Sequence, residues 1–436
     1  MQNELLNDSA ATSARGPVEK LGSLYHLDSK ESCQSWKTPA WKALPKRWGH
    51  SFHPMCSYLA MFPPGIPRYF IEQFTEPGDI VLDPFSGRGT APLEACVSSR
   101  VGIGIDLNPL AYLLTHAKVD PPTEEEALER IGSLRRHYRR IPTDNVPENI
   151  KMLFDGRGVL PRLLYLKKSL DREDRTDRFL LAALTGILHG NVHKDGKSTS
   201  YLSISMPNTF SMSPNYIRRY IRKHRLHKIP VDVFDQLTRK VKRLFKDGPP
   251  SKKGRAYLYD ARQFSQIEDP DLRRGNVKLI VTSPPYLKVV NYGKFNWIRL
   301  WLLDEPTEKV DKQLRLDDQH TLSRYLEFMA TVLQQCEQVI RPDGVCVFAI
   351  GDVQEPGKPP NNLAELVWDY VKGRAGLNLL AILEDSLPVN DKVTRIWGSK
   401  KGRATKVDRF LILYKERKPF PYYRNGNSAL MSKLTS

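Results

Sequence analysis

Long apolar runs, paired cysteines and repeated segments are scarce in this 436-residue sequence. The longest apolar stretch, residues 179–188, is far too short to span a bilayer, and residues 1–16 lack the apolar core of a secretory signal. Five scattered cysteines without a paired spacing argue against a disulfide framework and against a zinc site. We therefore expect a cytoplasmic protein in a reducing compartment, with no membrane segment and no metal.

The chain has enough apolar residues for a large core, and it carries a strong excess of positive charge. Its hydrophobic content of 40% supports either one large domain with insertions or two domains. Lys and Arg number 67 against 49 Asp and Glu, so the formal net charge is +18. An excess of this size indicates a polyanionic partner, although ribosomal and membrane-surface proteins are also basic.

A short motif directly after an apolar run carries most of the functional information. It reads Thr282-Ser283-Pro284-Pro285-Tyr286. The two prolines stiffen the turn and lack N–H groups, so the carbonyls of Ser283 and Pro284 are free to accept hydrogen bonds from a ligand. A hydroxyl, rigid carbonyls and an aromatic ring suit a planar base that carries an exocyclic amine. An ordinary turn at the end of a strand is the alternative.

A second motif lies upstream in residues 80–90, where a short apolar strand ends in an acid and a glycine loop leads into a helix. Gly87 and Gly89 allow a ligand to approach the backbone closely. Asp106 ends the next apolar strand about twenty residues later, the spacing at which a doubly wound sheet places a carboxylate on ribose hydroxyls. Pro92 stands where a dinucleotide site has its third glycine. A nucleoside without phosphates therefore fits better than a pyrophosphate.

Together these motifs resemble those of the DNA amino-methyltransferases, which transfer a methyl group from S-adenosylmethionine to cytosine N4 or adenine N6. The strings that carry the resemblance are Asp83-Pro84-Phe85-Ser86-Gly87-Arg88-Gly89-Thr90 and Ser283-Pro284-Pro285-Tyr286. Residues 53–71 also resemble the segment that precedes the cofactor loop in permuted members and lines the methionine end. The resemblance covers roughly residues 49–117 and 255–415.

This resemblance implies an α/β fold with a Rossmann-like class I methyltransferase sheet and a mainly helical insert. It implies S-adenosylmethionine as the cofactor, held by Phe62, Pro63, Asp83, Pro84, Phe85, Gly87, Gly89, Thr90, Asp106 and Asp260. Catalysis would involve Ser283, Pro284, Pro285 and Tyr286, and it would require neither a metal nor a covalent intermediate. For Asp260, a simple turn aspartate is the alternative.

Within the family, Ser-Pro-Pro-Tyr is more typical of cytosine-N4 enzymes, whereas adenine-N6 enzymes usually carry Asp or Asn at the first position. We expect a site-specific DNA (cytosine-N4)-methyltransferase, with adenine-N6 methylation as the alternative. Methylation of RNA or of a protein glutamine, where Asn-Pro-Pro-Tyr is commoner, and a non-catalytic DNA-binding subunit are further alternatives. Cytosine-C5 methylation is excluded, because that family needs a cysteine after a proline and none of the five cysteines follows one.

The expected organisation is a methyltransferase domain that is split by an insert. We assign the N-terminal extension, cofactor-binding half, basic helical insert, catalytic half and C-terminal tail to residues 1–48, 49–117, 118–254, 255–418 and 419–436. Apolar residues at helical spacing predict a helix over residues 321–339. A turn at residues 341–344 should lead into a strand over residues 345–350, and residues 410–414 predict a late strand of the same sheet.

The insert holds most of the excess positive charge. Residues 211–255 contain fourteen Lys or Arg and three Asp, a net charge of +11, and the aromatic rings of Tyr216 and Tyr220 are interleaved with them. This combination is typical of phosphate contacts joined with stacking. The expected contacts to double-stranded DNA are Arg218, Arg219, Arg222, Lys223 and Arg225. A basic helix packed on the catalytic domain is the alternative.

Two further expectations follow from the resemblance. The enzyme would be prokaryotic and nucleoid-associated, and it would belong to a restriction-modification or related system. A cognate restriction endonuclease is then a candidate partner besides DNA.

Overall fold

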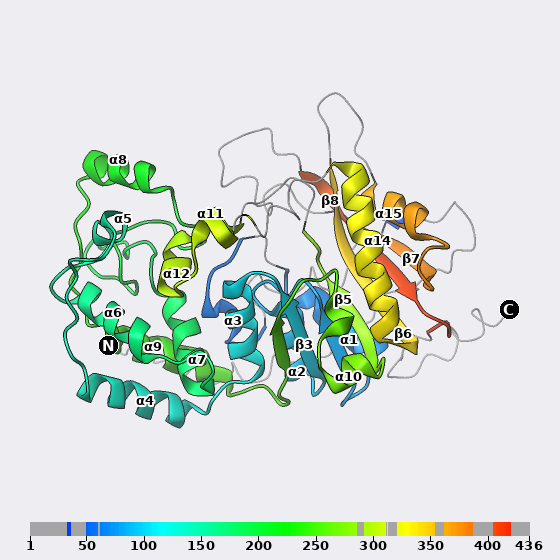
Figure 1. The fold of residues 1–436 in the computed structure, drawn as a ribbon, viewed down its shortest axis with the longest axis horizontal. Coiled ribbons are helices and arrows are strands. Elements are labelled where there is room, and N and C mark those ends of the chain that lie inside the picture. Colours follow the sequence, from blue (N-terminus) through cyan, green and yellow to red (C-terminus); the bar gives the residue numbers. More distant parts are fainter. Residues whose placement is uncertain are drawn as a thin grey trace, which may run out of the picture.

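The computed structural model describes residues 33–35, 49–59, 62–285, 292–310, 312, 321–353, 362–386 and 404–419 (Figure 1). Tyr286 of the predicted catalytic motif lies outside these residues. The strands are β1 (Cys33–Ser35), β2 (Ile80–Asp83), β3 (Val101–Asp106), β4 (Arg255–Leu258), β5 (Val277–Thr282), β6 (Ile340–Val353), β7 (Asn378–Ser386) and β8 (Ala404–Tyr414). The helices around the sheet are α1 (Gly65–Phe74), α2 (Thr90–Val97), α3 (Pro109–Val119), α10 (Pro270–Arg273), α11 (Tyr292–Phe295), α12 (Trp297–Leu302), α14 (Leu322–Val339) and α15 (Leu363–Val371).

The strands form one eight-stranded sheet in the order β1-β7-β8-β6-β5-β2-β3-β4. Neighbouring strands are parallel, except that β8 runs antiparallel to both β6 and β7. From β2 the chain proceeds to β3 and β4 on one side and then returns to β5 and β6 on the other, so the strand order reverses beside β2. The predicted doubly wound α/β sheet is confirmed. Ligands of such sheets bind outside the carboxyl ends of the strands at this reversal, here β2 and β5.

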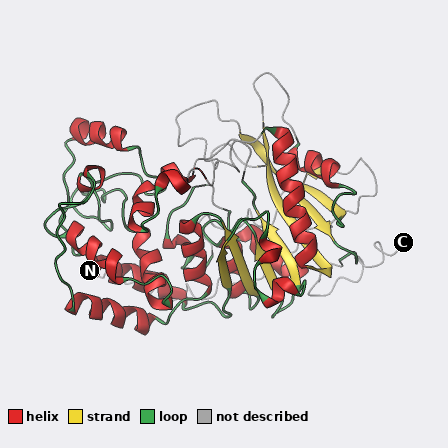
Figure 2. Cartoon of the chain, in the orientation of Figure 1, coloured by secondary structure: helices red, strands yellow, loops and turns green. Residues whose placement is uncertain are grey.

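Helices cover both faces of the sheet (Figure 2). One face packs against α10, α14 and α15, and the other packs against α1 and α2. Because successive side chains of a strand point to opposite faces, Ile80 and Leu82 lie in the first core and Val81 lies in the second. Strands β2 and β5 are buried along their whole length, as expected of parallel strands with helices on both sides.

A mainly helical insert separates β3 from β4, as predicted (Figure 1). After α3 it contains α4 (Glu124–Arg136), α5 (Glu148–Lys151), α6 (Val159–Ser169), α7 (Arg175–Thr185), α8 (Pro214–His224) and α9 (Val233–Leu244). Helix α4 begins with a capping box formed by Thr123 and Glu126. The apolar core of the insert continues into α3 and α12, so the insert packs firmly on the sheet domain.

The helix predicted over residues 321–339 is confirmed as α14, but the turn predicted after it is wrong. Strand β6 already begins at Ile340, which pairs with Val277, and the next pair joins Leu279 to Val345. The four intervening residues of β6 therefore bulge opposite Lys278. The Lys278 ammonium holds this bulge by donating to the Asp343 carbonyl at 2.7 Å and to the Asp343 carboxylate at 2.8 Å.

Among the described residues, no helix is both long and apolar enough to cross a membrane.

Candidate cofactor and catalytic site

The two predicted motifs meet at the carboxyl ends of β2 and β5. Asp83 is the last residue of β2, and Thr282 is the last residue of β5. The Thr282 hydroxyl donates a hydrogen bond of 2.6 Å to Asp83 Oδ1, and both side chains are buried. This bond spans 199 positions of the sequence and joins the strand before the glycine loop to the strand before Ser283. Sequence reasoning assigned no role to Thr282.

The glycine loop after β2 is tied to the neighbouring strand and helix. Ser86 N donates to the Ile105 carbonyl at 2.9 Å, and Gly89 N donates to the Ser86 carbonyl at 2.7 Å. Both glycines have positive φ, 50° at Gly87 and 77° at Gly89. A Cβ at Gly89 would lie 2.8 Å from Thr115 of α3, whereas a Cβ at Gly87 would meet nothing closer than 3.9 Å. Gly89 therefore allows close packing of α2 on α3, and Gly87 leaves its backbone accessible to a ligand.

Asp106 lies beside the glycine loop at the end of β3. Its carboxylate accepts hydrogen bonds of 2.8 Å from Gly87 N and from Asn108 N. Asn108 caps α3 and donates a hydrogen bond of 2.9 Å to the Tyr58 hydroxyl. A ring carbon of Tyr58 would lie 3.9 Å from a Cβ at Gly87. Sequence reasoning missed Tyr58 and Asn108, although Asn followed by proline at a strand end is a helix-start signal.

Two carboxyl groups at this site are hard to ionise. Burial raises the pKa of Asp83 to about 7, although hydrogen bonds from Thr282 and Phe85 N oppose this shift. Burial also raises the pKa of Asp106 to about 6, against the hydrogen bonds from Asn108 and Gly87. A ligand that brings positive charge or hydroxyl donors to these groups would be favoured, because it would compensate their lost hydration.

The remaining predicted cofactor residues differ in their burial and in their contacts. The half-buried Phe85 ring lies 5.8 Å from the Phe328 ring of α14, centroid to centroid, and Pro84 is buried. Phe62 is half-buried against the core that α1 forms with the sheet, and Pro63 is exposed. Thr90 is the first residue of α2, where its buried hydroxyl accepts a hydrogen bond from Arg88.

Asp260 lies two residues beyond β4 and is paired with Arg262. Its carboxylate accepts hydrogen bonds of 2.5 to 3.1 Å from the Arg262 guanidinium. Burial raises the pKa of Asp260, but hydrogen bonding and charge from Arg262 outweigh burial and leave the pKa below its usual range. The alternative of a turn aspartate explains these contacts, and contact with the adenine of a cofactor stays a prediction.

The predicted catalytic motif is described as far as Pro285. Ser283 and Pro285 are half-buried and Pro284 is buried, directly beyond the last residue of β5. The next described elements are α11 and α12, against which residues 208–212 of the insert pack. Here Ser211 N donates to the Phe295 carbonyl at 2.6 Å, and the Trp297 indole N–H donates to the Met212 carbonyl at 2.9 Å.

A buried arginine holds this contact between the insert and α12. The Arg299 guanidinium donates to the Asn208 carbonyl at 2.6 Å and to Asn296 Oδ1 at 2.7 Å. His189, also buried, lies 2.8 Å through Nδ1 from the Pro207 carbonyl, and burial lowers its pKa to about 3. The insert segment before α8 is thereby fixed to the helix that follows the catalytic motif.

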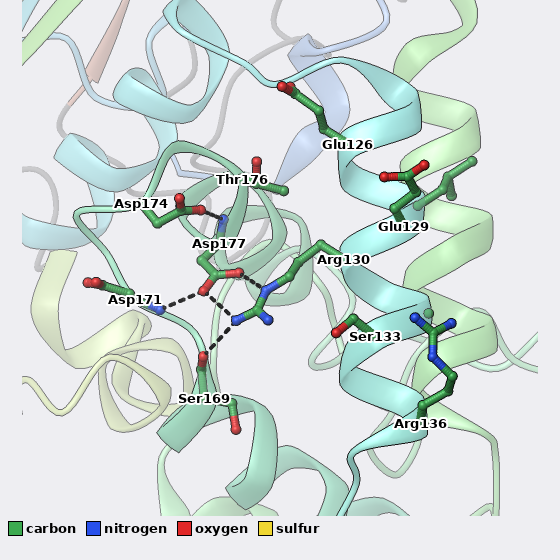
Figure 3. Close-up of a pocket in the computed structure, with 12 residues that line it drawn as sticks. Glu126, Glu129, Arg130, Ser133, Arg136, Ser169, Asp171, Asp174, Thr176 and Asp177 are labelled. Atoms are coloured by element: carbon green, nitrogen blue, oxygen red, sulfur yellow. Dashed lines mark hydrogen bonds and ion pairs between the residues drawn. The ribbon is translucent and has the colours of Figure 1, made fainter.

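A surface hollow lies in the insert, away from the two motifs. It has a volume of about 1120 Å³ and is lined by α4, α7 and the segment between α6 and α7. Figure 3 shows Arg130 reaching across to Asp177, with contacts of 2.7 and 2.9 Å. None of the predicted site residues lines it. The ion pair between Arg130 and Asp177 joins α4 to α7 across this hollow, which is a structural role.

Comparison with known proteins finds a family match over about a quarter of the chain. Residues 12–115, which include the glycine loop and Asp106, match the family model described as DNA methylase of the N6/N4 type. The predicted resemblance to the DNA amino-methyltransferases is confirmed. Methylation of an exocyclic amine with S-adenosylmethionine as the cofactor is what this resemblance implies. The match does not separate cytosine N4 from adenine N6.

Curated relatives are similar over short stretches. The chain is 34% identical over 129 residues to the type II methyltransferase M.MjaII of Methanocaldococcus jannaschii, covering 29% of this chain and 24% of that one. It is 47% identical over 53 residues to the type II methyltransferase M.XycI of Xanthomonas campestris pv. cyanopsidis, covering 12% of this chain and 18% of that one. The matched stretches thus span no more than a quarter of either relative.

Among solved structures, TrmN from Thermus thermophilus aligns with 84% of this chain and 52% of its own at 12% identity and a TM-score of 0.31. A putative DNA modification methylase from the same organism, complexed with S-adenosylmethionine, aligns with 40% of this chain and 56% of its own at 17% identity and a TM-score of 0.22. Scores this low do not establish a shared fold, so the fold class rests on the strand order of this chain.

Proposed function

We propose that this chain is an S-adenosylmethionine-dependent DNA methyltransferase that acts on the N4 amine of cytosine. The observation that carries the proposal is the hydrogen bond between Asp83 and Thr282. It brings the glycine loop and Ser283 to one position beside β2 and β5, so a nucleoside cofactor and a base amine can meet there. The family match supports DNA amino-methylation, and the choice of N4 rests on Ser283.

The residues at the site fit S-adenosylmethionine, which supplies an electrophilic methyl group on a cationic sulfur. Gly87 presents backbone without a Cβ, and Asp106 offers a carboxylate for ribose hydroxyls. Phe85 adds a half-exposed ring beside the loop. The raised pKa values of Asp83 and Asp106 suit a cationic ligand without phosphates.

Ser283 and Pro284 would act on the amine. A base amine is a poor nucleophile because its lone pair is delocalised into the ring. Hydrogen bonds from the amine to the Ser283 hydroxyl and the Pro284 carbonyl would favour a more pyramidal nitrogen, and alignment with the methyl group would supply much of the remaining acceleration. The base must leave the duplex for this contact, with Tyr286 proposed to stack on it.

We propose that residues 118–254 recognise the target, with Arg218, Arg219, Arg222, Lys223 and Arg225 as contacts to DNA. A cognate restriction endonuclease is proposed as a second partner of the system. The DNA contacts rest on the charge of the insert and on the contact of residues 208–212 with α11 and α12. The endonuclease rests on the family resemblance alone.

Incubation of the purified protein with S-adenosylmethionine and diverse DNA, followed by mass spectrometry of the nucleosides, tests the proposal. We expect N4-methylcytosine. Adenine methylated at N6 as the only product would overturn the choice of base and keep the family. Methylation of RNA alone, or of no nucleic acid, would overturn the proposal.

A further inference from the structure

We propose that α8 is a recognition helix that reads base edges in the major groove, with Arg219 as its central specificity-determining residue. This inference rests on the proposed function in one respect, because it takes double-stranded DNA as the substrate. It goes further by assigning sequence recognition to one helix and guanine to one residue.

Helix α8 stands apart from the other helices of the insert (Figure 1). Ile217 is its one fully buried residue, and the partly buried Ile221 packs beside it on the core. Ser213 caps its start, and Arg225 ends it in the left-handed conformation with φ 48°. Most of the circumference of α8 is therefore open to solvent, which a helix packed on the catalytic domain would not show.

The open side of α8 is mainly basic. At 100° per residue, Arg219 lies roughly 160° around the helix from Ile217, and Arg222 lies roughly 140° away in the other direction. Both are exposed, as are Arg218 and Lys223. The helix contains no acidic residue, and within the described part of the chain none of these four cations forms an ion pair. Their charge is available to an external anion.

The acidic residues nearest in sequence are engaged elsewhere. Asp232 and Asp235, at the start of α9, pair with Arg135 of α4 at 3.3 and 2.7 Å. On α8 itself, the rings of Tyr216 and Tyr220 stack at 5.9 Å and the His224 ring lies 4.3 Å from Tyr220, centroid to centroid. This aromatic row lies on one flank of the helix, between the apolar contact and the basic side.

The dimensions of α8 match the major groove. An α-helix with side chains is about 10–12 Å wide and the groove is about 12 Å wide. Eleven residues extend about 16 Å, which corresponds to about five base pairs. Inserted with Ile217 facing the protein, α8 would direct Arg219 to the groove floor. Arginine there donates two hydrogen bonds to O6 and N7 of guanine.

The connection between α8 and the sheet domain runs through α12, whose apolar residues share one core with α3. The segment that leads into α8 is bonded to α11 and α12 through Ser211 and Met212, and the buried Arg299 holds the same segment at Asn208. Both helices follow the catalytic motif in sequence. A base pair read by α8 would therefore lie at a fixed separation from the base placed at Ser283.

The test is Arg219→Lys, which keeps the charge but cannot form the two parallel hydrogen bonds to guanine. The matched control is Arg243→Lys, an exposed arginine at the end of α9. Full-length wild type and both variants are used to select duplexes from a randomised pool in the absence of methyl transfer. Affinities for the selected site and for sites with single guanine replacements are then measured.

We expect wild type and Arg243→Lys to discriminate against one guanine replacement, and Arg219→Lys to lose about 10-fold or more of that discrimination while non-specific affinity is kept. Discrimination unchanged within about twofold in Arg219→Lys, or no sequence preference in wild type, would overturn the inference, as would preference for RNA. Because binding is read without chemistry, failure of methylation would refute the proposed function and leave this result standing.

Discussion

At the scale of single residues, Asp106 is our proposed ligand for the ribose of the cofactor. Its carboxylate lies at the end of β3 and already accepts hydrogen bonds from the glycine loop. We expect Asp106→Ala to weaken S-adenosylmethionine binding by about 1.5 to 3 kcal/mol, the usual strength of hydrogen bonds to a charged group. Titration calorimetry measures this loss, and Asp369→Ala on the exposed side of α15 is the control. An unchanged dissociation constant would remove Asp106 from the site.

Ser283 should affect turnover more than binding. It lies directly beyond β5, where its hydroxyl would contact the amine as the methyl group is transferred. We expect Ser283→Ala to keep the affinity for S-adenosylmethionine and to lower kcat by about 100-fold, the pattern of an interaction made mainly at the transition state. Single-turnover methylation assays with saturating DNA measure the change. Turnover near that of wild type would show that the hydroxyl is not needed.

The binding of S-adenosylmethionine should depend on pH through Asp83 and Asp106. The pKa values of the two carboxyl groups in the folded protein are about 7 and about 6, above the ordinary 3.8. The protonated carboxyls therefore contribute fully to the stability of the fold below about pH 4, and this contribution is lost as pH rises through about 6 and 7. A cationic ligand favours the ionised carboxylates, so binding should release protons and affinity should rise between about pH 5 and pH 7. Calorimetry in buffers of different ionisation enthalpy counts the protons, and Asp83→Asn should reduce the count. Binding without proton release would contradict this linkage.

At the scale of secondary-structure elements, the Thr282 hydroxyl fixes the end of β5 to the end of β2. Thr282→Val keeps the shape but removes a donor from the buried Asp83 carboxyl, so we expect a loss of about 1 to 3 kcal/mol in the free energy of unfolding. Thr282→Ser is the matched control, because it retains the hydroxyl and should lose less. Denaturant unfolding compares the two. Equal stability of wild type and Thr282→Val would mean that the bond contributes nothing.

At the scale of the whole molecule, the charge of the insert should govern affinity for DNA. Replacing Arg218, Arg219, Arg222 and Lys223 with Gln should weaken DNA binding and flatten its salt dependence by about 0.9 log units for each phosphate that the variant no longer neutralises. The affinity for S-adenosylmethionine should not change, since α8 lies far from α2, the helix that follows the glycine loop (Figure 1). The control replaces three exposed arginines near the start of the insert: Arg136, the last residue of α4, and Arg139 and Arg140 just beyond it. Coincident salt slopes for wild type and the α8 variant would exclude backbone contacts by this helix.

Local sequence determined the elements that carry the chemistry. A strand that ends in an acid and is followed by glycines, or by serine and two prolines, can be recognised without tertiary information, because the residues involved are neighbours. For that reason the strand, loop and helix around Asp83 and Gly87, the strand before Asp106 and the helix over residues 321–339 were predictable. The excess charge of the insert was equally visible in the composition.

Tertiary structure decided everything that depends on contact between distant segments. Three such contacts join residues that are far apart in the sequence. They are the hydrogen bond from Thr282 to Asp83, the close approach of Gly89 to Thr115 that leaves no room for a Cβ, and the bulge of β6 opposite Lys278. The same holds for α8, because a basic amphipathic sequence is compatible with a packed helix and with a free one. In the structure, Ile217 is the one fully buried residue of α8, so the basic side of this helix stays exposed. The sequence of a helix cannot show this, because exposure depends on which other segments pack against the helix.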